Sequence, residues 1–467
     1  MSPPAWTAPW KSEARKLVSL AMPVAATQLS TMLMGFVDTV MVGRVGVEAI
    51  AAVALANVCL FGVLMFFAGV MFGLDPIVSQ AHGANQGERA GRALQHGLVL
   101  CAVFSLPACL ALLATERVLL FFGQDPALAR TAQEFITVQI PSTPFFLIYF
   151  ALRQYLQGRE IVRPPLFVIL FANGVNAFLC WVFIFGNLGS PALGVVGAGL
   201  ATAFTRVFMA GSLALLIVRW ELYRGAWVPW SRESLSPRAI LEVVRYGVPV
   251  AFQILLEMLA FGAATLLAGR LGPLALAAHT IALNMASIAF MLPLGVASGA
   301  ATRVGNLLGA REPAAAQRAA WVALLLGTGV MTASAVAFVA LRHWLPQIYT
   351  EDPGAIALAA TILPIAGAFQ IFDGAQVVGC GILRGMGNVR PALLFNLVGY
   401  WLLGIPFSIW LGFEYAGGRG WGLPGVWWGL CFGLAVVASL LVLRIASHGP
   451  AHLESRLPGA AQTSAAH

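Results

Sequence analysis

Hydrophobic residues fill long stretches of this chain, and short polar segments separate one stretch from the next. Each stretch reaches or exceeds the ~20 residues that an α-helix needs to cross the hydrocarbon core of a bilayer. None of them alternates apolar and polar residues as the strands of a membrane barrel do, so each one predicts a helix. The pattern predicts twelve spans, at residues 17–42, 51–78, 93–115, 132–156, 165–187, 194–218, 240–268, 275–301, 319–341, 355–383, 392–413 and 422–446.

Composition agrees with this pattern. Of the 467 residues, 59% are hydrophobic and 10% are charged, whereas charged residues make up about 25% of an ordinary soluble domain. We therefore predict an all-α polytopic membrane protein. The first apolar stretch is too long for a cleavable signal peptide. The six cysteines form no CxxC pair and the seven histidines have no metal-ligand spacing, so we expect neither a structural disulfide nor a cofactor.

Basic residues are distributed unevenly between the loops. Of the 27 Lys and Arg residues, 20 belong to the N-terminus, the even-numbered loops and the C-terminus, six lie in the opposite loops, and Arg206 falls inside a span. Because Lys and Arg favour the cytoplasmic side, both termini are predicted to be cytoplasmic. The net charge of +8 is then mainly a topology signal, with some attraction to anionic membrane lipids, and we expect no nucleic-acid partner.

The second half of the sequence repeats the first. The segment from Val42 resembles the segment from Ala268 at an offset of 226, and the offset grows to 227 at Pro164 and 228 at Gly194. Such slow drift is expected after a duplication, and two six-helix halves with the same orientation predict pseudo-symmetric lobes, a transporter plan. A structural unit or a channel made of two fused bundles is the alternative. The predicted organisation is an N-lobe at 1–218, a cytoplasmic linker at 219–239, a C-lobe at 240–446 and a disordered tail at 447–467.

Three acidic residues lie well inside the predicted spans, at Asp38, Glu257 and Asp373. A charged group at the centre of a membrane helix costs about 2.5–3.5 kcal/mol on insertion scales, so acids that remain there are functional candidates. Residues three or four apart share one face of a helix. This spacing places four further side chains beside the acids as supporting candidates: Thr31, Gln253, Phe369 and Gln376.

The chemistry of these acids has several interpretations. Burial favours the neutral form of a carboxyl group, which would allow these acids to carry protons. Alternatively, several oxygen atoms around a carboxylate could hold Na⁺, a hard cation that prefers oxygen ligands, at Asp38 or at Glu257 and Asp373. Each acid could also be structural, hydrogen-bonded between helices. The residues alone leave these interpretations open.

The chain resembles the multidrug and toxic compound extrusion (MATE) family, and within it the NorM-like branch, over roughly residues 12–446. The resemblance rests on the duplicated twelve-span plan and on the segments GFVDTVMVGRVGVEAIAAVALAN, GLDPIVSQAHGAN and FQIFDGAQVVGCGILRGMGNVRP. It implies an antiporter coupled to H⁺ or Na⁺, not an enzyme, that exports drugs and organic cations by alternating access of two lobes. It also implies small cationic or amphipathic substrates and a location in the plasma membrane, the inner membrane of a bacterium. We expect a monomer.

The resemblance also implies roles for individual residues. The first-helix acid of the family serves a proton or cation site of the N-lobe, which here is Asp38. The acids of the C-lobe correspond to Glu257 and Asp373. Relatives often carry a Tyr one turn before the second of these acids, where this chain has Phe369 and therefore lacks a hydroxyl.

A second departure from the family lies on the fifth span. Relatives often have two polar residues four apart near the first-helix acid. Asn176 matches the first of them, but Cys180 takes the second place, and a thiol is a poor ligand for a hard cation. Asn173, one turn away, is a candidate replacement. Together with Phe369, this departure favours H⁺ as the coupling ion.

Three other functions fit the sequence less well. A flippase for lipid-linked oligosaccharides, from the same superfamily, would usually have more than twelve spans and a cationic cavity rather than buried acids. A membrane enzyme would need a catalytic motif such as DDxxD or HExxH, and the sequence has neither. A channel is disfavoured because the duplicated lobes contain no filter-like segment. The sequence also has no Walker A loop, so we expect no ATP-driven transport.

Overall fold

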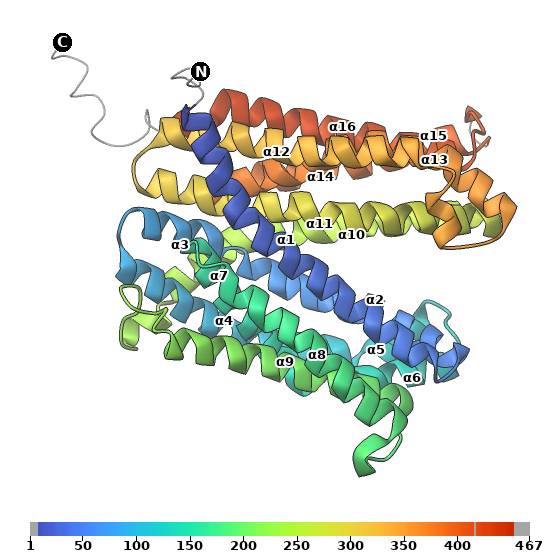
Figure 1. The fold of residues 1–467 in the computed structure, drawn as a ribbon, viewed down its shortest axis with the longest axis horizontal. Coiled ribbons are helices and arrows are strands. Elements are labelled where there is room, and N and C mark those ends of the chain that lie inside the picture. The colour runs from blue at the N-terminus through green and yellow to red at the C-terminus, as the bar shows by residue number, and fades with distance from the viewer. Residues whose placement is uncertain (1–7, 415–416, 453–467) are drawn as a thin grey trace. The chain divides into compact units, whose positions relative to one another are not determined.

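The computed structural model describes residues 8–414 and 417–452, and helices dominate these residues (Figure 1). Within them, twelve helical spans are long and apolar enough to cross a membrane, judged by length and composition. They overlap one by one with the twelve predicted spans, so the predicted fold class is confirmed. Residues 453–467, most of the predicted disordered tail, lie outside the described residues. The last helix, α16 (Leu423–His448), reaches into the first residues of that tail.

The chain divides into two compact units, and both boundaries fall inside a helix. The first unit comprises residues 26–251, and the second comprises residues 1–25 and 252–467. The boundaries interrupt α1 (Ala8–Gly43) and α10 (Pro237–Arg270). The first unit also contains α2 (Val47–Met71), α3 (Leu74–Gly83), α4 (Gly87–Leu113), α5 (Thr115–Phe121), α6 (Pro126–Thr137), η1 (Ile140–Ser142), α7 (Thr143–Gly158), α8 (Arg163–Phe185), η2 (Asn187–Gly189), α9 (Gly194–Arg219) and η3 (Arg232–Leu235).

The second unit continues from α10 through the remaining helices. It contains α11 (Pro273–Gly309), α12 (Pro313–Ala340), η4 (Leu345–Ile348), α13 (Pro353–Gly385), α14 (Arg390–Asn396), η5 (Leu397–Gly404), α15 (Ile405–Gly412) and α16. The segment η5 is a π-helix, and together with α14 and α15 it forms one span.

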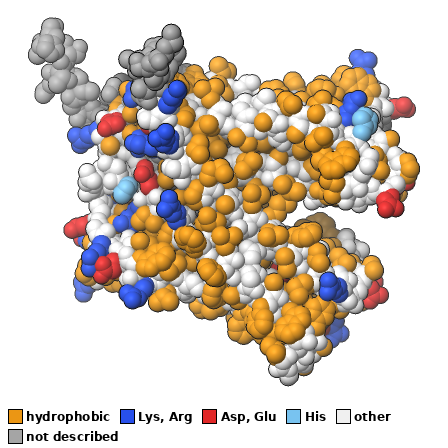
Figure 2. Space-filling view, in the orientation of Figure 1, with side chains coloured by type: hydrophobic (Ala, Val, Ile, Leu, Met, Phe, Trp, Pro, Cys, Tyr) orange, Lys and Arg blue, Asp and Glu red, His pale blue; other side chains and the backbone are white. Residues whose placement is uncertain are grey.

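The surface has the distribution of side chains that a membrane protein requires. Hydrophobic side chains cover the visible face along the helices, whereas charged side chains gather at the helix ends (Figure 2). Large apolar side chains are exposed in the middle of helices, as Phe171 of α8 is, with 71% of its surface accessible. Lipid around the middle of each helix and water at its ends explain both observations.

Unusual backbone angles recur at the spacing of the sequence repeat. Residues with positive φ form pairs at offsets of 226, 226, 227 and 228, in the same order as the offsets found in the sequence. A positive φ is strained for most residues, so its recurrence at matching places indicates that both halves use the same turns. The pairs are Gly46 and Gly272, Asn85 and Arg311, Glu160 and Gly387, and Gly194 and Gly422.

The fourth and tenth spans also begin alike. Each starts with an aspartate followed by a proline, at Asp125 before α6 and at Asp352 before α13. Asp125 accepts from the backbone N–H of Ala127 at 2.9 Å, and Asp352 accepts from that of Ala355 at 2.7 Å. An N-cap aspartate accepts a hydrogen bond from a free backbone N–H of the first turn. The proline after it has no N–H, so the first turn has one donor fewer to satisfy.

Residues 219–239, the predicted linker between the lobes, pack against helices of the first unit. The fully buried Gln95 of α4 donates to the Val228 carbonyl at 2.6 Å and accepts from the Ser234 hydroxyl at 2.6 Å. The Tyr155 hydroxyl of α7 donates to the Ala226 carbonyl at 2.6 Å. A Cβ at Gly91 would lie 2.7 Å from that carbonyl oxygen, so only glycine permits this approach. The segment is therefore held by the first unit.

Candidate functional site

Asp38 lies on α1 in the first unit, where three side chains approach its carboxylate. The Asn176 amide donates to Oδ1, and the Cys180 thiol lies 3.4 Å from the same oxygen. The Thr202 hydroxyl lies 3.4 Å from Oδ2. Arg206, which belongs to the same helix as Thr202, interacts electrostatically with the carboxylate. The aspartate is thus surrounded by hydrogen-bond donors and one positive charge.

Helical spacing explains why these donors meet. Asn176 and Cys180 are four apart on α8 and share a face, and Thr202 and Arg206 are four apart on α9. Asn176 is fully buried, and its Oδ1 lies 3.0 Å from the Thr205 hydroxyl. An ionised carboxylate can only accept, so the amide nitrogen must face Asp38 and the amide oxygen must face Thr205. The arrangement suits an ionised carboxylate that can accept a proton.

Two residues that the sequence placed near Asp38 make their hydrogen bonds to backbone carbonyls. The Thr31 hydroxyl donates to the Thr27 carbonyl of its own helix at 2.9 Å, and its side chain is exposed. The Asn173 amide donates to the carbonyls of Ser30 and Ile169, at 3.1 and 2.9 Å. Cys180 itself approaches the carboxylate, so the structure does not use Asn173 as its replacement.

The second unit brings the other two acids together. Glu257 of α10 and Asp373 of α13 interact electrostatically. Gln376, one turn after Asp373, donates to Glu257 Oε2 at 3.3 Å and to Asn396 Oδ1 at 3.1 Å. Asp373 is 5% exposed, and its Oδ1 has no hydrogen-bond partner among the described residues. The site therefore combines a buried Asp373 with a partly buried Glu257, and the Gln376 amide holds Glu257.

The remaining candidates lie around this pair. Gln253 and Asn396 approach the thiol of Cys380. Phe369 is 2% exposed, and its ring packs edge-on against Phe261 and Trp427, with 5.9 Å between ring centroids in each case. Phe369 therefore packs against other aromatic rings and contributes no polar side-chain atom to the site.

Sequence reasoning missed several residues of both sites. It noted Arg206 only as a charge inside a span, and it did not single out Thr202, Thr205, Asn396 or Tyr400. The spacing of three and four between Thr202, Thr205 and Arg206 was a usable signal, because it marks one polar face on an apolar helix.

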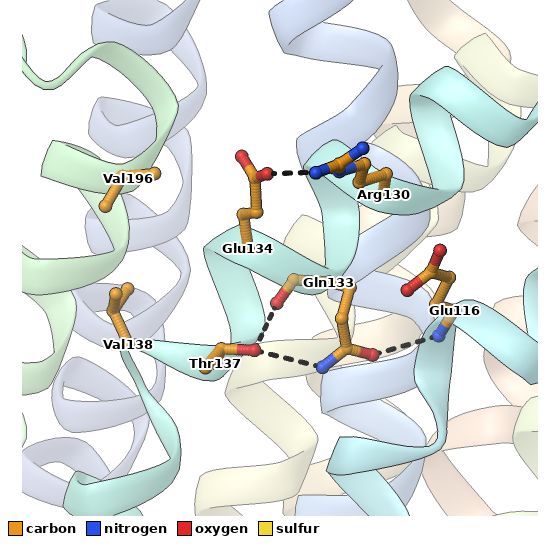
Figure 3. A pocket seen from close by; sticks show the side chains of 7 residues that line it. All are labelled: Glu116, Arg130, Gln133, Glu134, Thr137, Val138 and Val196. Carbon is orange, nitrogen blue, oxygen red and sulfur yellow. Dashed lines mark hydrogen bonds and ion pairs between the residues drawn. The ribbon is translucent and has the colours of Figure 1, made fainter.

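A separate cavity of about 360 Å³ lies in the first unit, and none of the three acids lines it. In Figure 3, Arg130 faces Glu134, 3.7 Å apart, and the Gln133 side chain accepts from the Glu116 backbone N–H at 2.9 Å. Both charged residues of the pair are exposed, so the contact is weak. Among the described residues, no three His, Cys, Asp or Glu side chains could hold a metal ion.

Comparisons with known proteins agree on one family. The MatE family model matches residues 23–182 and 249–410. A protein of Mesorhizobium japonicum named "Probable multidrug resistance protein NorM" is 34% identical over 450 residues, which are 93% of this chain and 94% of the relative. A protein of the same name from Burkholderia pseudomallei is 38% identical over 431 residues, 91% of each chain.

Solved structures show the same fold. The eukaryotic MATE transporter AtDTX14 aligns with a TM-score of 0.85 and 25% identity, over 95% of this chain and 97% of that one. An outward-facing multidrug resistance MATE family transporter of the MOP superfamily aligns with a TM-score of 0.84 and 20% identity, over 93% and 96% of the two chains.

Proposed function

Because this chain belongs to the MatE family, we propose that it exports cationic or amphipathic drugs from the cytoplasm in exchange for protons. Its NorM relatives are named multidrug resistance proteins, which supports small organic molecules as substrates. The exchange is an antiport by alternating access, and Asp38 carries the coupling proton. The twelve apolar spans and the bacterial relatives support a location in the inner membrane. The distribution of Lys and Arg between the loops supports cytoplasmic termini.

The donor shell of Asp38 is the observation that favours H⁺ over Na⁺. A sodium ion binds through the lone pairs of several oxygen atoms. Asn176 instead presents an N–H to Oδ1, and Cys180 presents a thiol, a poor ligand for a hard cation. This shell supports a carboxylate that alternates between an ionised, hydrogen-bonded form and a protonated form.

Charge links the proton to the substrate. Ionised Asp38 attracts a cationic drug, whereas protonated Asp38 does not. Protonation from the outside therefore releases the drug there, and loss of the proton to the cytoplasm restores the binding site. A ligand shifts the balance between inward- and outward-facing forms only by its different affinity for the two, so drug and proton must favour opposite steps of the cycle.

Glu257 and Asp373 support a second protonation site. Two carboxylates that interact in an apolar environment resist simultaneous ionisation, so they share a proton during part of the cycle. The hydrogen bond from Gln376 holds Glu257 in place while the pair changes its charge. The two acids titrate as a coupled pair, so the proton is assigned to the pair and not to one residue.

The substitution Asp38→Asn tests the proposal. It keeps the size of the side chain and removes the titrating group. We expect ethidium still to bind, more weakly than to the ionised aspartate, while efflux driven by a pH gradient falls to the level of empty liposomes. Purified protein in liposomes, with ethidium fluorescence recorded after a pH jump, measures this. Full efflux by the variant would remove Asp38 from the coupling role.

Asp352→Asn is the matched control. Asp352 caps α13 outside the acidic sites, and asparagine caps a helix about as well as aspartate does. Efflux by this variant should equal that of the unmodified protein. A similar loss in both variants would point to a general loss of structure and not to coupling.

A further inference from the structure

Tyr400 is a buried tyrosine whose hydroxyl has no hydrogen-bond partner among the described residues. Its side chain is 0% exposed. Buried hydroxyl groups are nearly always hydrogen-bonded, because leaving one unpaired costs roughly 1–3 kcal/mol. Tyr400 also interacts electrostatically with both Glu257 and Asp373. The Tyr400 ring packs on Phe261, one turn after Glu257, with 6.1 Å between ring centroids. A donor without a partner thus lies near the acid pair, in which Oδ1 of Asp373 is an acceptor without a partner among the described residues.

An irregular helix presents this side chain to the acids. Tyr400 belongs to the π-helix η5, and Pro406 follows in the first turn of α15. A proline lacks the N–H for the regular helical bond and clashes with the preceding turn, which explains the wider turns before it. The neighbouring Trp401 donates to the Leu256 carbonyl at 3.1 Å, directly before Glu257. The π-helix is therefore fixed to α10 at the position of the acid.

The second repeat alone has this irregularity. At the repeat offset of 227, Leu179 of α8 corresponds to Pro406, and α8 is a regular helix throughout. The two halves therefore differ here, and the difference coincides with the acidic pair that the first unit lacks. π-helical turns are frequent at functional sites for this reason: they rotate one side chain out of the regular register.

We propose that the Tyr400 hydroxyl is the third group of the second unit's acidic site, donating a hydrogen bond to the ionised acid pair and losing that bond when the pair takes a proton. This inference rests on the proposed proton coupling and names a positioning residue for it. The O–H of Tyr400 stays intact in both states. The proton that arrives binds a carboxylate oxygen, and the hydroxyl then turns from donor to acceptor.

The other titratable groups near Tyr400 are few. Cys380 of α13 interacts with it electrostatically, and Arg384 on the same helix acts on Cys380. His279 of α11 packs on Trp427 of α16 at 5.6 Å between ring centroids, and its Nε2 lies 3.1 Å from the Thr265 hydroxyl. Removing the Tyr400 hydroxyl should therefore affect the protonation of Glu257 and Asp373 more than that of the other groups.

Ethidium binding in the Asp38→Asn background isolates this site, because the remaining pH dependence then comes from the second unit. Affinity is measured by fluorescence polarisation across pH 5–9. Tyr400→Phe removes a donor that stabilises the ionised pair, so the pair holds its proton more tightly. We expect the midpoint to move up by about one pH unit, the size of one hydrogen bond to a charged group.

Moving the hydroxyl tests its position. Phe369 is one turn before Asp373, and both Phe369 and Tyr400 pack on Phe261, at 5.9 and 6.1 Å. Phe369→Tyr added to Tyr400→Phe should bring the midpoint back. Tyr149→Phe is the matched control, because Tyr149 also has a buried hydroxyl without a partner among the described residues, but in the first unit. It should leave the midpoint unchanged.

The outcomes separate this inference from the proposed function. An unchanged midpoint in Tyr400→Phe, or no pH dependence at all in Asp38→Asn, overturns the role of Tyr400 and leaves the antiport intact. No pH dependence in the unmodified protein contradicts the antiport itself. If Tyr400→Phe does not fold, 3-fluorotyrosine at position 400 keeps the shape with a stronger donor. The midpoint must then move down, and a midpoint that stays or rises overturns the proposal.

Discussion

Three neighbouring side chains donate hydrogen bonds to Asp38, and Asn176 is the one held on both sides. It is fully buried, it donates to the carboxylate, and its own oxygen is held by Thr205 at 3.0 Å. Because an unprotonated carboxylate only accepts hydrogen bonds, every donor lost makes the charged form less stable relative to the neutral form. The pH dependence of transport should therefore report on this amide.

Asn176→Ala should move the pH of half-maximal efflux up by about one to two units, since a hydrogen bond to a charged group contributes about 1.5–3 kcal/mol. Efflux assays in liposomes at a series of pH values measure the shift. Asn173→Ala is the matched control one turn earlier, because Asn173 donates to backbone carbonyls and not to the acid. A downward shift in Asn176→Ala, or equal shifts in both variants, contradicts the donor role.

Individual residues also show how far the sequence alone can lead. The acids could be predicted because a charge inside an apolar run is anomalous. Thr202 could not, because its hydroxyl also bonds the Ala198 carbonyl of its own helix at 3.1 Å, as threonines in membrane helices do without any function. Tyr400 could not be predicted as a site residue, because an aromatic residue in an apolar span is ordinary. The π-helix that orients it is visible only in the structure.

Small residues determine how closely helices of the second unit approach. Gly381 and Gly385 of α13 face α11, and a Cβ at Gly381 would lie 2.8 Å from the carbonyl carbon of Ala297. One at Gly385 would lie 3.0 Å from that of Ala301. Glycine spaced by four lets membrane helices pack backbone to backbone, where no hydrophobic effect drives association. Asp373 lies on the same helix, so this contact also sets its depth in the unit.

Gly381→Ala should therefore lower the melting temperature of the detergent-solubilised protein, because overpacking costs about 1–3 kcal/mol. Gly329→Ala on α12 is its matched control, since a Cβ there meets no atom within 4 Å. That variant should melt at or slightly above the unmodified temperature, because alanine favours helix over glycine. Fluorescence-detected size exclusion after heating measures both, and equal melting temperatures would refute the close packing.

At the scale of elements, hydropathy predicted the twelve spans but not their interruptions. The second span is continuous in hydropathy, yet α2 ends at Met71 and α3 begins at Leu74, with Pro76 in its first turn. The π-helix before Pro406 is a similar case. Apolar side chains are stable in a membrane whatever the helix geometry, so hydropathy carries little information about helix breaks. Proline positions carry more information, because Pro76 lies at the first of these interruptions and Pro406 at the second.

For the molecule as a whole, duplication gave two halves that share turns but not chemistry. The recurring positive φ angles match the sequence offsets, but the acids do not recur. At the offset of 226, Asp38 falls on Ala264, seven residues after Glu257 on the corresponding span, and Asp373 lies on the tenth span. The predicted lobes, the cytoplasmic termini and the monomeric state stay predictions. The units divide inside α1 and α10, which no composition change in the sequence marks, because a continuous apolar helix can serve two packing partners.

The central claim is that protons, and not sodium ions, drive export. The most direct measurement uses the unmodified protein in liposomes, with ethidium efflux followed under a pH gradient without Na⁺ and then under a Na⁺ gradient at constant pH. We predict efflux under the pH gradient alone, and efflux under the Na⁺ gradient alone would contradict the account.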